Sequence, residues 1–118
     1  MHLSKALEFL EAAEINQDRQ LHNAATSDAI ISAINSKDAI CLALTGSTNK
    51  SDNHVDAVSE LKRAGRVGAE LSPTLGQLLK LKTRSQYAPL SVAPAHATKA
   101  VEWAERMLSA AQDVVAGR

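Results

Sequence analysis

Several residue types that define large classes of protein are scarce in this sequence. A single cysteine, Cys41, excludes an intramolecular disulfide and a zinc site built from several cysteines. No apolar run approaches the roughly 18–20 residues needed to cross a bilayer, and no N-terminal segment has the pattern of a secretion signal. The formal net charge is zero, which argues against a strongly basic coat for nucleic acid. We therefore expect a cytoplasmic protein without a membrane segment.

The composition favours one all-helical domain. The chain has 118 residues, enough for a single hydrophobic core but not for two. Ala and Leu dominate, whereas the aromatic residues that strands prefer make up only 3% of the chain. We predict a single all-α bundle domain over residues 1–118.

Residues 22–45 contain neither glycine nor proline, and we predict that they belong to the central helix of the bundle. Large apolar side chains cover more than half of its circumference, so other helices must pack on several sides. The remaining side carries small residues, which would let one neighbour approach closely. The large apolar positions are Ile30, Ile31, Ile34, Ile40, Cys41, Leu42 and Leu44. The small positions are Ala25, Ala29, Ser32, Ser36, Ala39 and Ala43.

Three further boundaries follow from local signals in the first half of the chain. Apolar residues at helical spacing predict a helix over 3–15. Asn16 or Asp18 would cap the central helix, which we expect to start near residue 19 and to end before Gly46. Asn53 is the expected N-cap of a third helix, which ends at Gly65.

The second half of the chain predicts two more helices. We expect a loop over 65–71 and a fourth helix that starts at Ser72-Pro73 and stops near Tyr87, because Pro89 disfavours helical backbone before it. Ser91 would cap the last helix, with Pro94 in its first turn. Its buried seam alternates four and three residues apart, and Trp103 beside it would close the bundle edge or contact another subunit. The seam residues are Ala97, Val101, Ala104, Leu108, Ala111 and Val115. The result is an up-and-down bundle of five helices.

Asp38 lies inside the apolar arc of the central helix. A buried carboxylate is costly unless it is paired, and continuing the apolar face of the fourth helix brings Lys82 inward as its partner. Two readings stay open. The pair is either part of a site that directs basic side chains toward a phosphate, or an ion pair that joins two helices in the core.

The end of the fourth helix carries a second group of candidate binding residues. Arg84, Gln86 and Tyr87 offer hydrogen-bond donors and an aromatic platform for a phosphate or a base. The alternative is an ordinary helix end, where cations interact favourably with the helix dipole. The charge of this region is one-sided, since residues 62–84 contain six basic residues and one acidic residue. The basic residues are Lys62, Arg63, Arg66, Lys80, Lys82 and Arg84.

His54 would supply a titratable group if the connection before it folds toward Arg84; otherwise it is a surface residue near a helix cap. The other histidines lie far apart, and no spacing typical of a metal site is present. We therefore predict no metal and no cofactor.

The order of four segments resembles a known family. The segments are KALEFLEAAE, HNAATSDAIISAINSKDAICLALTG, the polar turn DNH and LLKLKTRSQYAPLSV. Together they resemble the HEPN family of helical domains (higher eukaryotes and prokaryotes nucleotide-binding), especially its short single-domain bacterial members. The resemblance covers essentially the whole chain. It implies a homodimeric helical bundle without a metal.

The resemblance also implies a chemistry that this sequence matches only in part. Many members are endoribonucleases in which an Arg holds the scissile phosphate and a His four to six residues away moves the proton. After Arg84 those positions are Pro89, Leu90 and Ser91. The segment therefore keeps basic residues and an aromatic one but lacks the histidine of the pair.

Three functions remain open. The leading hypothesis is a homodimeric domain that binds RNA or a nucleotide without the standard ribonuclease pair. The second is a metal-independent endoribonuclease of a toxin–antitoxin system, with Arg84, Tyr87 and His54 as candidate catalytic residues. The third is a dimerisation or interaction module that docks an antitoxin or another partner protein.

Overall fold

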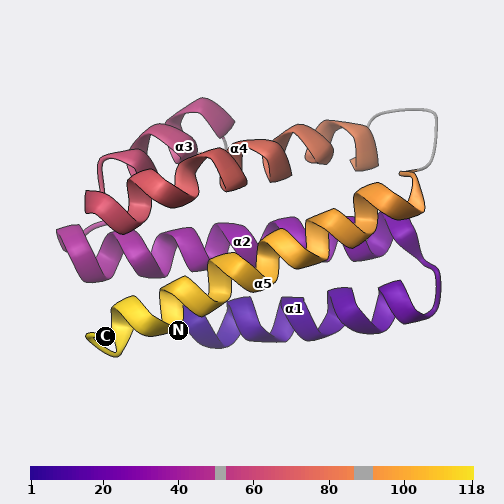
Figure 1. The fold of residues 1–118 in the computed structure, drawn as a ribbon, viewed down its shortest axis with the longest axis horizontal. Coiled ribbons are helices and arrows are strands. Elements are labelled where there is room, and N and C mark those ends of the chain that lie inside the picture. The colour runs from indigo at the N-terminus through magenta and orange to yellow at the C-terminus, as the bar shows by residue number, and fades with distance from the viewer. Residues whose placement is uncertain (50–52, 87–91) are drawn as a thin grey trace.

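The chain folds into five helices, and in the described residues every regular element is a helix (Figure 1). The structure is a computed structural model that describes residues 1–49, 53–86 (83–86 by backbone only) and 92–118. The five helices are α1 (His2–Asp18), α2 (His22–Thr45), α3 (His54–Lys62), α4 (Gly65–Gln86) and α5 (Pro94–Val115). The all-α prediction is confirmed. Among the described residues, no helix has both the length and the apolar character needed to span a membrane.

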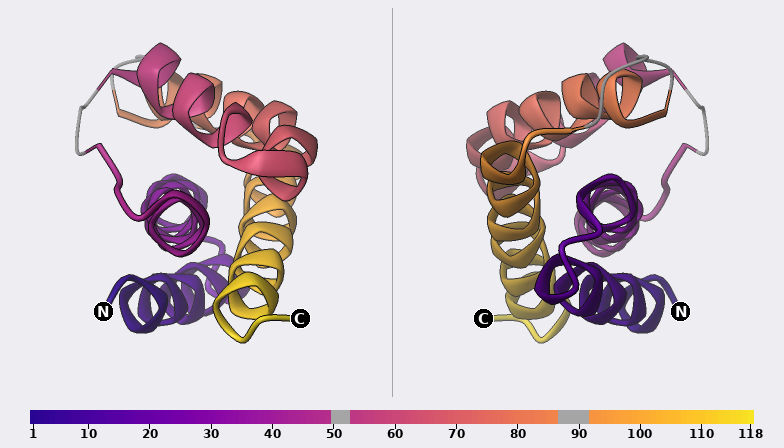
Figure 2. Two further views of the ribbon diagram at one scale, coloured as in Figure 1. Left: turned by 90° about the vertical axis from the view of Figure 1, so that its left-hand side faces the viewer. Right: turned by 90° about the vertical axis from the view of Figure 1, so that its right-hand side faces the viewer.

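Helix α2 is the centre of the bundle, as predicted. It contacts all four other helices and lies between α1, α5 and the α3–α4 pair (Figure 2). Its small residues permit close approach of α1, because the Ser32 hydroxyl donates a hydrogen bond of 2.7 Å to the backbone oxygen of Ala6. The cover is incomplete at the C-terminal end, where Leu42 and Leu44 are 40% and 47% exposed. The prediction that other helices pack on several sides of α2 is confirmed, but its last turn keeps partly exposed apolar side chains.

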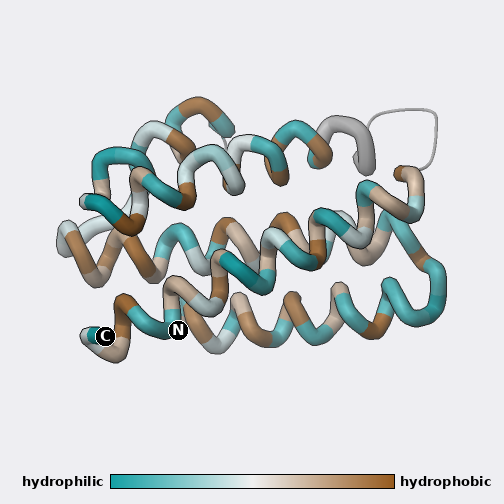
Figure 3. Tube along the Cα trace, in the orientation of Figure 1, coloured by the Kyte–Doolittle hydropathy of each residue, from teal (hydrophilic) through white to brown (hydrophobic). Residues whose placement is uncertain are grey.

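The seam of α5 is confirmed except at its end. Apolar positions recur along the helix with polar positions between them (Figure 3). Five of the six predicted seam residues are buried, whereas Val115 is 50% exposed. Trp103 is partly buried and packs against the core, so it closes the edge between α4 and α5.

The start of α2 differs from the prediction. Asn16 and Asp18 belong to α1, and α2 begins at His22 with no side-chain cap. The chain reverses at Gln20, which has a positive φ of 62°. The Asn16 side chain instead bonds across the turn, donating to an Asp28 carboxylate oxygen at 2.7 Å. Asn16, which was predicted to cap α2, therefore joins α1 to α2 through its side chain instead.

The start of α4 is the largest correction. Residues 65–71, expected as a loop, form the first two turns of α4, and Pro73 lies inside the helix. Pro73 has no N–H for the carbonyl of Ala69, and the Ser72 hydroxyl donates to that oxygen at 3.0 Å instead. Burial of Leu71, which is 7% exposed, favours the helical path.

The ends of α2 and α4 and the start of α3 follow the predicted signals, whereas α3 ends at Lys62, with Arg63 as its C-cap, and the predicted end at Gly65 is wrong because Gly65 begins α4. Gly46 ends α2 in the left-handed conformation, with φ of 82°. The Asn53 side chain caps α3 by accepting hydrogen bonds from the amides of Val55 and Asp56 at 2.9 and 3.3 Å. Helix α4 ends at Gln86, next to Tyr87, which lies outside the described residues. Ser91 also lies outside them, and the prediction that it caps the last helix is wrong, because the N-cap of α5 is Ala93, before Pro94, without a side-chain hydrogen bond.

Two glycines of α4 differ in what a side chain would meet. A Cβ atom on Gly68 would lie 2.0 Å from the backbone oxygen of Leu61, so glycine lets α3 and α4 meet. A Cβ atom on Gly76 would meet only a methyl carbon of Val58, at an ordinary 4.0 Å.

We expect Gly68→Ala to destabilise the fold by about 1–3 kcal/mol, because the two helices must separate. Gly76→Ala is the matched control and should stabilise it by roughly 0.5–1 kcal/mol, because alanine is the better helix former. Urea unfolding followed by far-UV circular dichroism measures both changes. A neutral Gly68→Ala would contradict the close contact of α3 and α4.

Candidate functional site

In the described part of the chain, a polar pocket is lined by residues of α1, α2, α3 and α4 and by none of α5. Figure 2 shows that α5 packs along one side of α2 only. The pocket has a volume of about 270 Å³ and is formed by the start of α1, the middle of α2, the α2–α3 connection, the start of α3 and the end of α4. Its basic or titratable nitrogen groups belong to Lys5, Lys37, Lys82, His2 and His54. Its amide and carboxylate groups belong to Asn35, Asn49, Asn53 and Asp38. We call this site the basic pocket.

Lys37, at the base of this pocket, is only 2% exposed. Its ammonium group donates to Asp38 Oδ1 at 3.0 Å, to Thr48 Oγ1 at 3.2 Å and to the backbone oxygen of Asn49 at 3.2 Å. It also forms an ion pair with Glu60 of α3. Lys37 was not among the predicted site residues. The available signal was that Lys37 and Asp38 are adjacent and that α2 has only one other charged residue, Asp28.

Asp38 is buried, at 7% exposure, as predicted. The cation that contacts it comes from Lys37 of the same helix, where we expected Lys82 of the fourth helix. The reason is the long, flexible lysine side chain, which lets neighbouring residues on one helix meet under the α2–α3 connection. Thr48 donates a second hydrogen bond to Asp38, at 2.7 Å. Lys82 lies on the same pocket and approaches the site from α4.

Hydrogen bonds from Thr48 and Asn49 attach the α2–α3 connection to Asp38 of α2 and to Glu60 of α3. Glu60 accepts a hydrogen bond of 2.8 Å from the amide of Asn49 and one of 3.2 Å from the Thr48 hydroxyl. Burial alone would lower the pKa of Lys37, but hydrogen bonds to Glu60 and Asp38 outweigh it and raise that pKa. Burial alone would raise the pKa of Glu60, but the hydrogen bonds from Lys37 and Asn49 lower it. Both groups therefore stay ionised near neutral pH.

Asp38 and Glu60 together outweigh the charge of Lys37 by one negative charge, so the positive groups of the basic pocket are Lys5 and Lys82 on its rim. Lys5 is exposed at the start of α1, and Lys82 is half-buried near the end of α4. Two ammonium groups on the rim suit an anion of limited size, such as a phosphate group, that stays at the rim and away from the carboxylates of the floor.

His54, the first residue of α3, lies in the basic pocket together with Lys82. Burial, and then the positive charge of Lys82, lower the pKa of His54 below its usual 6.5. Its imidazole is therefore neutral at pH 7, with one nitrogen able to accept a proton. His54, on α3, thus lines the same pocket as Lys82, which precedes Arg84 by two positions on α4. The side chains of Arg84 and Gln86, and all of Tyr87, are outside the described residues.

His2 is a member of the pocket that no sequence signal indicated. Its Nδ1 atom lies 3.4 Å from Asn35 Oδ1 and 3.9 Å from Asp38 Oδ2. The partners are more than thirty positions away along the chain, so no local spacing could reveal the contact.

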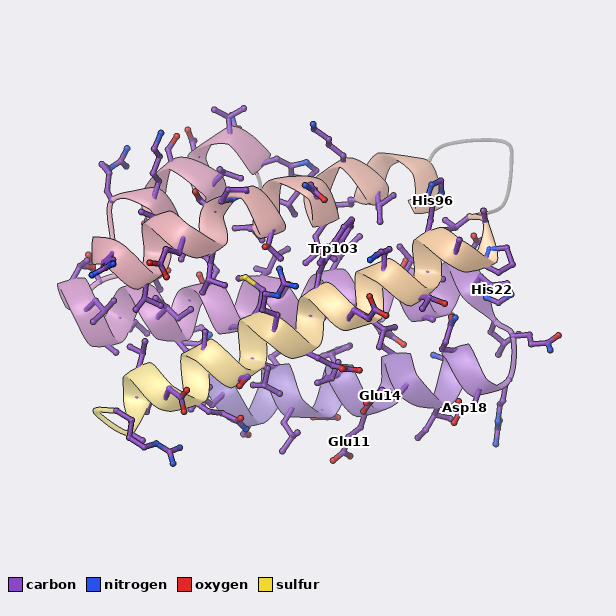
Figure 4. All side chains as sticks on the ribbon, in the orientation of Figure 1. Glu11, Glu14, Asp18, His22, His96 and Trp103 are labelled. Carbon is purple, nitrogen blue, oxygen red and sulfur yellow. The ribbon has the colours of Figure 1, made fainter. Side chains whose placement is uncertain are left out.

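Other candidate groups lie away from this pocket. Cys41 is buried in the core, and burial raises the pKa of its thiol to about 11, so it is unreactive at neutral pH. Figure 4 shows Glu11, Glu14 and Asp18 along α1, on the side of the bundle away from α3 and α4. Within the part of the chain that the structure describes, no three His, Cys, Asp or Glu side chains gather as a metal site would require.

Comparison with models of protein families gives a match over nearly the whole chain. The family model described as HEPN domain matches residues 1–114. A search among curated proteins finds no match.

We expect Lys37→Met to destabilise the fold by about 3–5 kcal/mol, because Asp38 and Glu60 would face each other without the cation between them. Urea unfolding measures this loss. Lys5→Met is the matched control: its side chain is exposed, and its effect should stay within about 0.5 kcal/mol. Equal stabilities of the two variants would contradict the buried network.

Proposed function

The chain belongs to the HEPN family, and we propose that it is a homodimeric, cytoplasmic domain that binds the phosphate of RNA or of a nucleotide in the basic pocket. The observation that carries the proposal is the convergence of Lys5, Lys82 and His54, from three different helices, on one polar cavity. Charge-assisted hydrogen bonds from lysine and arginine are the strongest ones available to a phosphate. Family membership favours a ligand of this class.

Each candidate binding residue has a proposed role. Lys82 and Arg84 lie two positions apart near the end of α4, and we assign both to holding the phosphate. Gln86 and Tyr87 continue that segment and contact parts of the ligand beyond this phosphate, such as the next unit of an RNA strand. Asp38 does not touch the ligand in this proposal; it holds Lys37 and the α2–α3 connection, which shapes the pocket wall.

A binding role fits the sequence better than the standard ribonuclease reaction. The family pattern requires a histidine after the phosphate-holding arginine, and Arg84 is followed there by Pro89, Leu90 and Ser91. The segment retains the groups that hold a phosphate and lacks the one that moves a proton.

The proposed dimer contact is the uncovered apolar surface at the end of α2. Ala39, Leu42 and Ala43 form a shallow hollow there with Val115 of α5. Side chains of this size are exposed on monomers singly, whereas a cluster of them marks a contact surface. An antitoxin or another partner protein would use the same surface if the domain is an interaction module.

We expect the wild-type protein to bind a short single-stranded RNA in fluorescence-anisotropy titrations at low salt, with affinity that falls as salt rises. Lys82→Ala and Arg84→Ala should each weaken binding about tenfold, because each removes a charge-assisted contact to phosphate. Lys62→Ala is the matched control, since Lys62 is an exposed basic residue of α3 outside the pocket. Equal losses in all three variants would indicate only a general charge effect and would contradict the assigned site.

A second candidate function, endoribonuclease activity, is favoured by the lowered pKa of His54. A neutral imidazole beside Lys82 is in the protonation state that a general base needs. We expect RNA cleavage in the presence of EDTA to disappear in His54→Ala and to persist in His22→Ala. Because the base acts when deprotonated, the rate should be level at neutral pH and fall on acidification below about 6.5. RNA that stays intact with the wild-type protein over a long incubation would exclude this function.

A further inference from the structure

An apolar groove runs between α3 and α4 next to the basic pocket. It has a volume of about 510 Å³, within the range of small-molecule sites, and is lined mainly by Val55, Val58, Gly76 and Leu79. His54 and Leu79 line both the groove and the basic pocket, so the two cavities are neighbours that share a wall. A ligand with an anionic end and a flat apolar end would fit both at once.

Gly76 keeps this groove open. The close contact of α3 and α4 requires glycine at position 68, where a Cβ atom would lie 2.0 Å from a backbone oxygen. No such contact exists at position 76, where a Cβ atom would be 4.0 Å from Val58, and glycine is a poor helix former. Neither packing nor helix stability therefore explains this glycine. A longer side chain there would fill the groove.

From these observations we propose that the α3–α4 groove holds the nucleobase of the ligand whose phosphate binds in the basic pocket. The inference rests on the proposed function and names the part of the ligand that gives selectivity. Aliphatic walls from Val55, Val58 and Leu79 suit the two faces of a base. Val55 is 72% exposed, so a bound base would cover an apolar side chain that the fold leaves in water.

Polar groups at the ends of the groove complete the fit. Lys80 and Ser59 lie on the groove and can hydrogen-bond the edge of a base. His54 lies where the groove meets the basic pocket, the position of the sugar between base and phosphate. The base of a free nucleotide and a base turned out of an RNA strand share this chemistry, and the experiment must tell them apart.

Isothermal titration with adenosine monophosphate and with ribose 5-phosphate tests the proposal. The wild-type protein should bind the nucleotide about tenfold more tightly than the sugar phosphate, because only the nucleotide fills the groove. Gly76→Leu should abolish this difference and keep the affinity for ribose 5-phosphate, while Gly76→Ala should largely retain both. Val55→Ser, at an exposed position, serves as a second groove variant and should reduce the difference several-fold.

The outcomes separate this inference from the proposed function. Equal affinities of the wild-type protein for the two ligands would overturn the groove assignment and leave the phosphate site standing. Absence of binding by both would overturn both proposals. A base of RNA is the occupant if an RNA oligomer binds more tightly than its abasic counterpart and Gly76→Leu removes this difference. A free nucleotide is the occupant if Gly76→Leu weakens the binding of the mononucleotide only.

Methyl NMR spectra provide a readout that does not depend on affinity differences. Adenosine monophosphate should shift the methyl signals of Val55, Val58 and Leu79 and leave those of Leu42 and Leu44 unchanged. Unchanged methyl signals of Val55, Val58 and Leu79 would overturn the inference. The groove would then be free for another occupant, such as an apolar helix of a protein partner.

Discussion

The fold depends on the buried ammonium group of Lys37, which the α2–α3 connection covers. The Lys37 ammonium group lies between Asp38 of its own helix and Glu60 of α3, with Thr48 and Asn49 completing its hydrogen bonds. An unpaired charge at 2% exposure would be prohibitively costly, so the network acts as a unit. It joins the C-terminal half of α2 to α3 through the connection between them. The position of α3 relative to α2 follows from this constraint.

That constraint also shapes both cavities. Asn49, Asn53 and His54 reach the basic pocket because the connection is fastened at Thr48 and Asn49. Packing of α3 against α4 then sets the width of the adjoining groove, with Gly68 at the point of closest approach. The structural ion network and the lining of the proposed binding pocket thus share residues that lie close together in the chain.

The site combines family features with a departure from the family pattern. Residues 1–114 match the HEPN domain, and the basic end of α4 is retained, but the histidine expected after Arg84 is missing. His54 of α3 and His2 of α1 line the basic pocket together with Lys82. Burial and the charge of Lys82 lower the pKa of His54, so its imidazole is neutral at pH 7. In the proposed function, the lysines supply the charge for binding and His54 is the candidate for proton transfer.

The sequence by itself determined the features that arise from residues close together in the chain. Helical spacing fixed the five-helix count and the central place of α2, and single residues such as Gly46 and Asn53 marked helix ends through their own backbone and side-chain bonds. The burial of Asp38 followed from its neighbours on the same helix.

Tertiary structure decided the rest. Residues 65–71 became helix because burial of Leu71 and the Ser72 bond to Ala69 outweighed local breaking signals. Lys37 became the partner of Asp38 because a long side chain can turn toward any acceptor that the fold supplies. His2 joined the pocket from the far end of the sequence. Local propensity acts over a few residues, whereas the pairing of charges and the walls of a cavity depend on which distant segments are brought together.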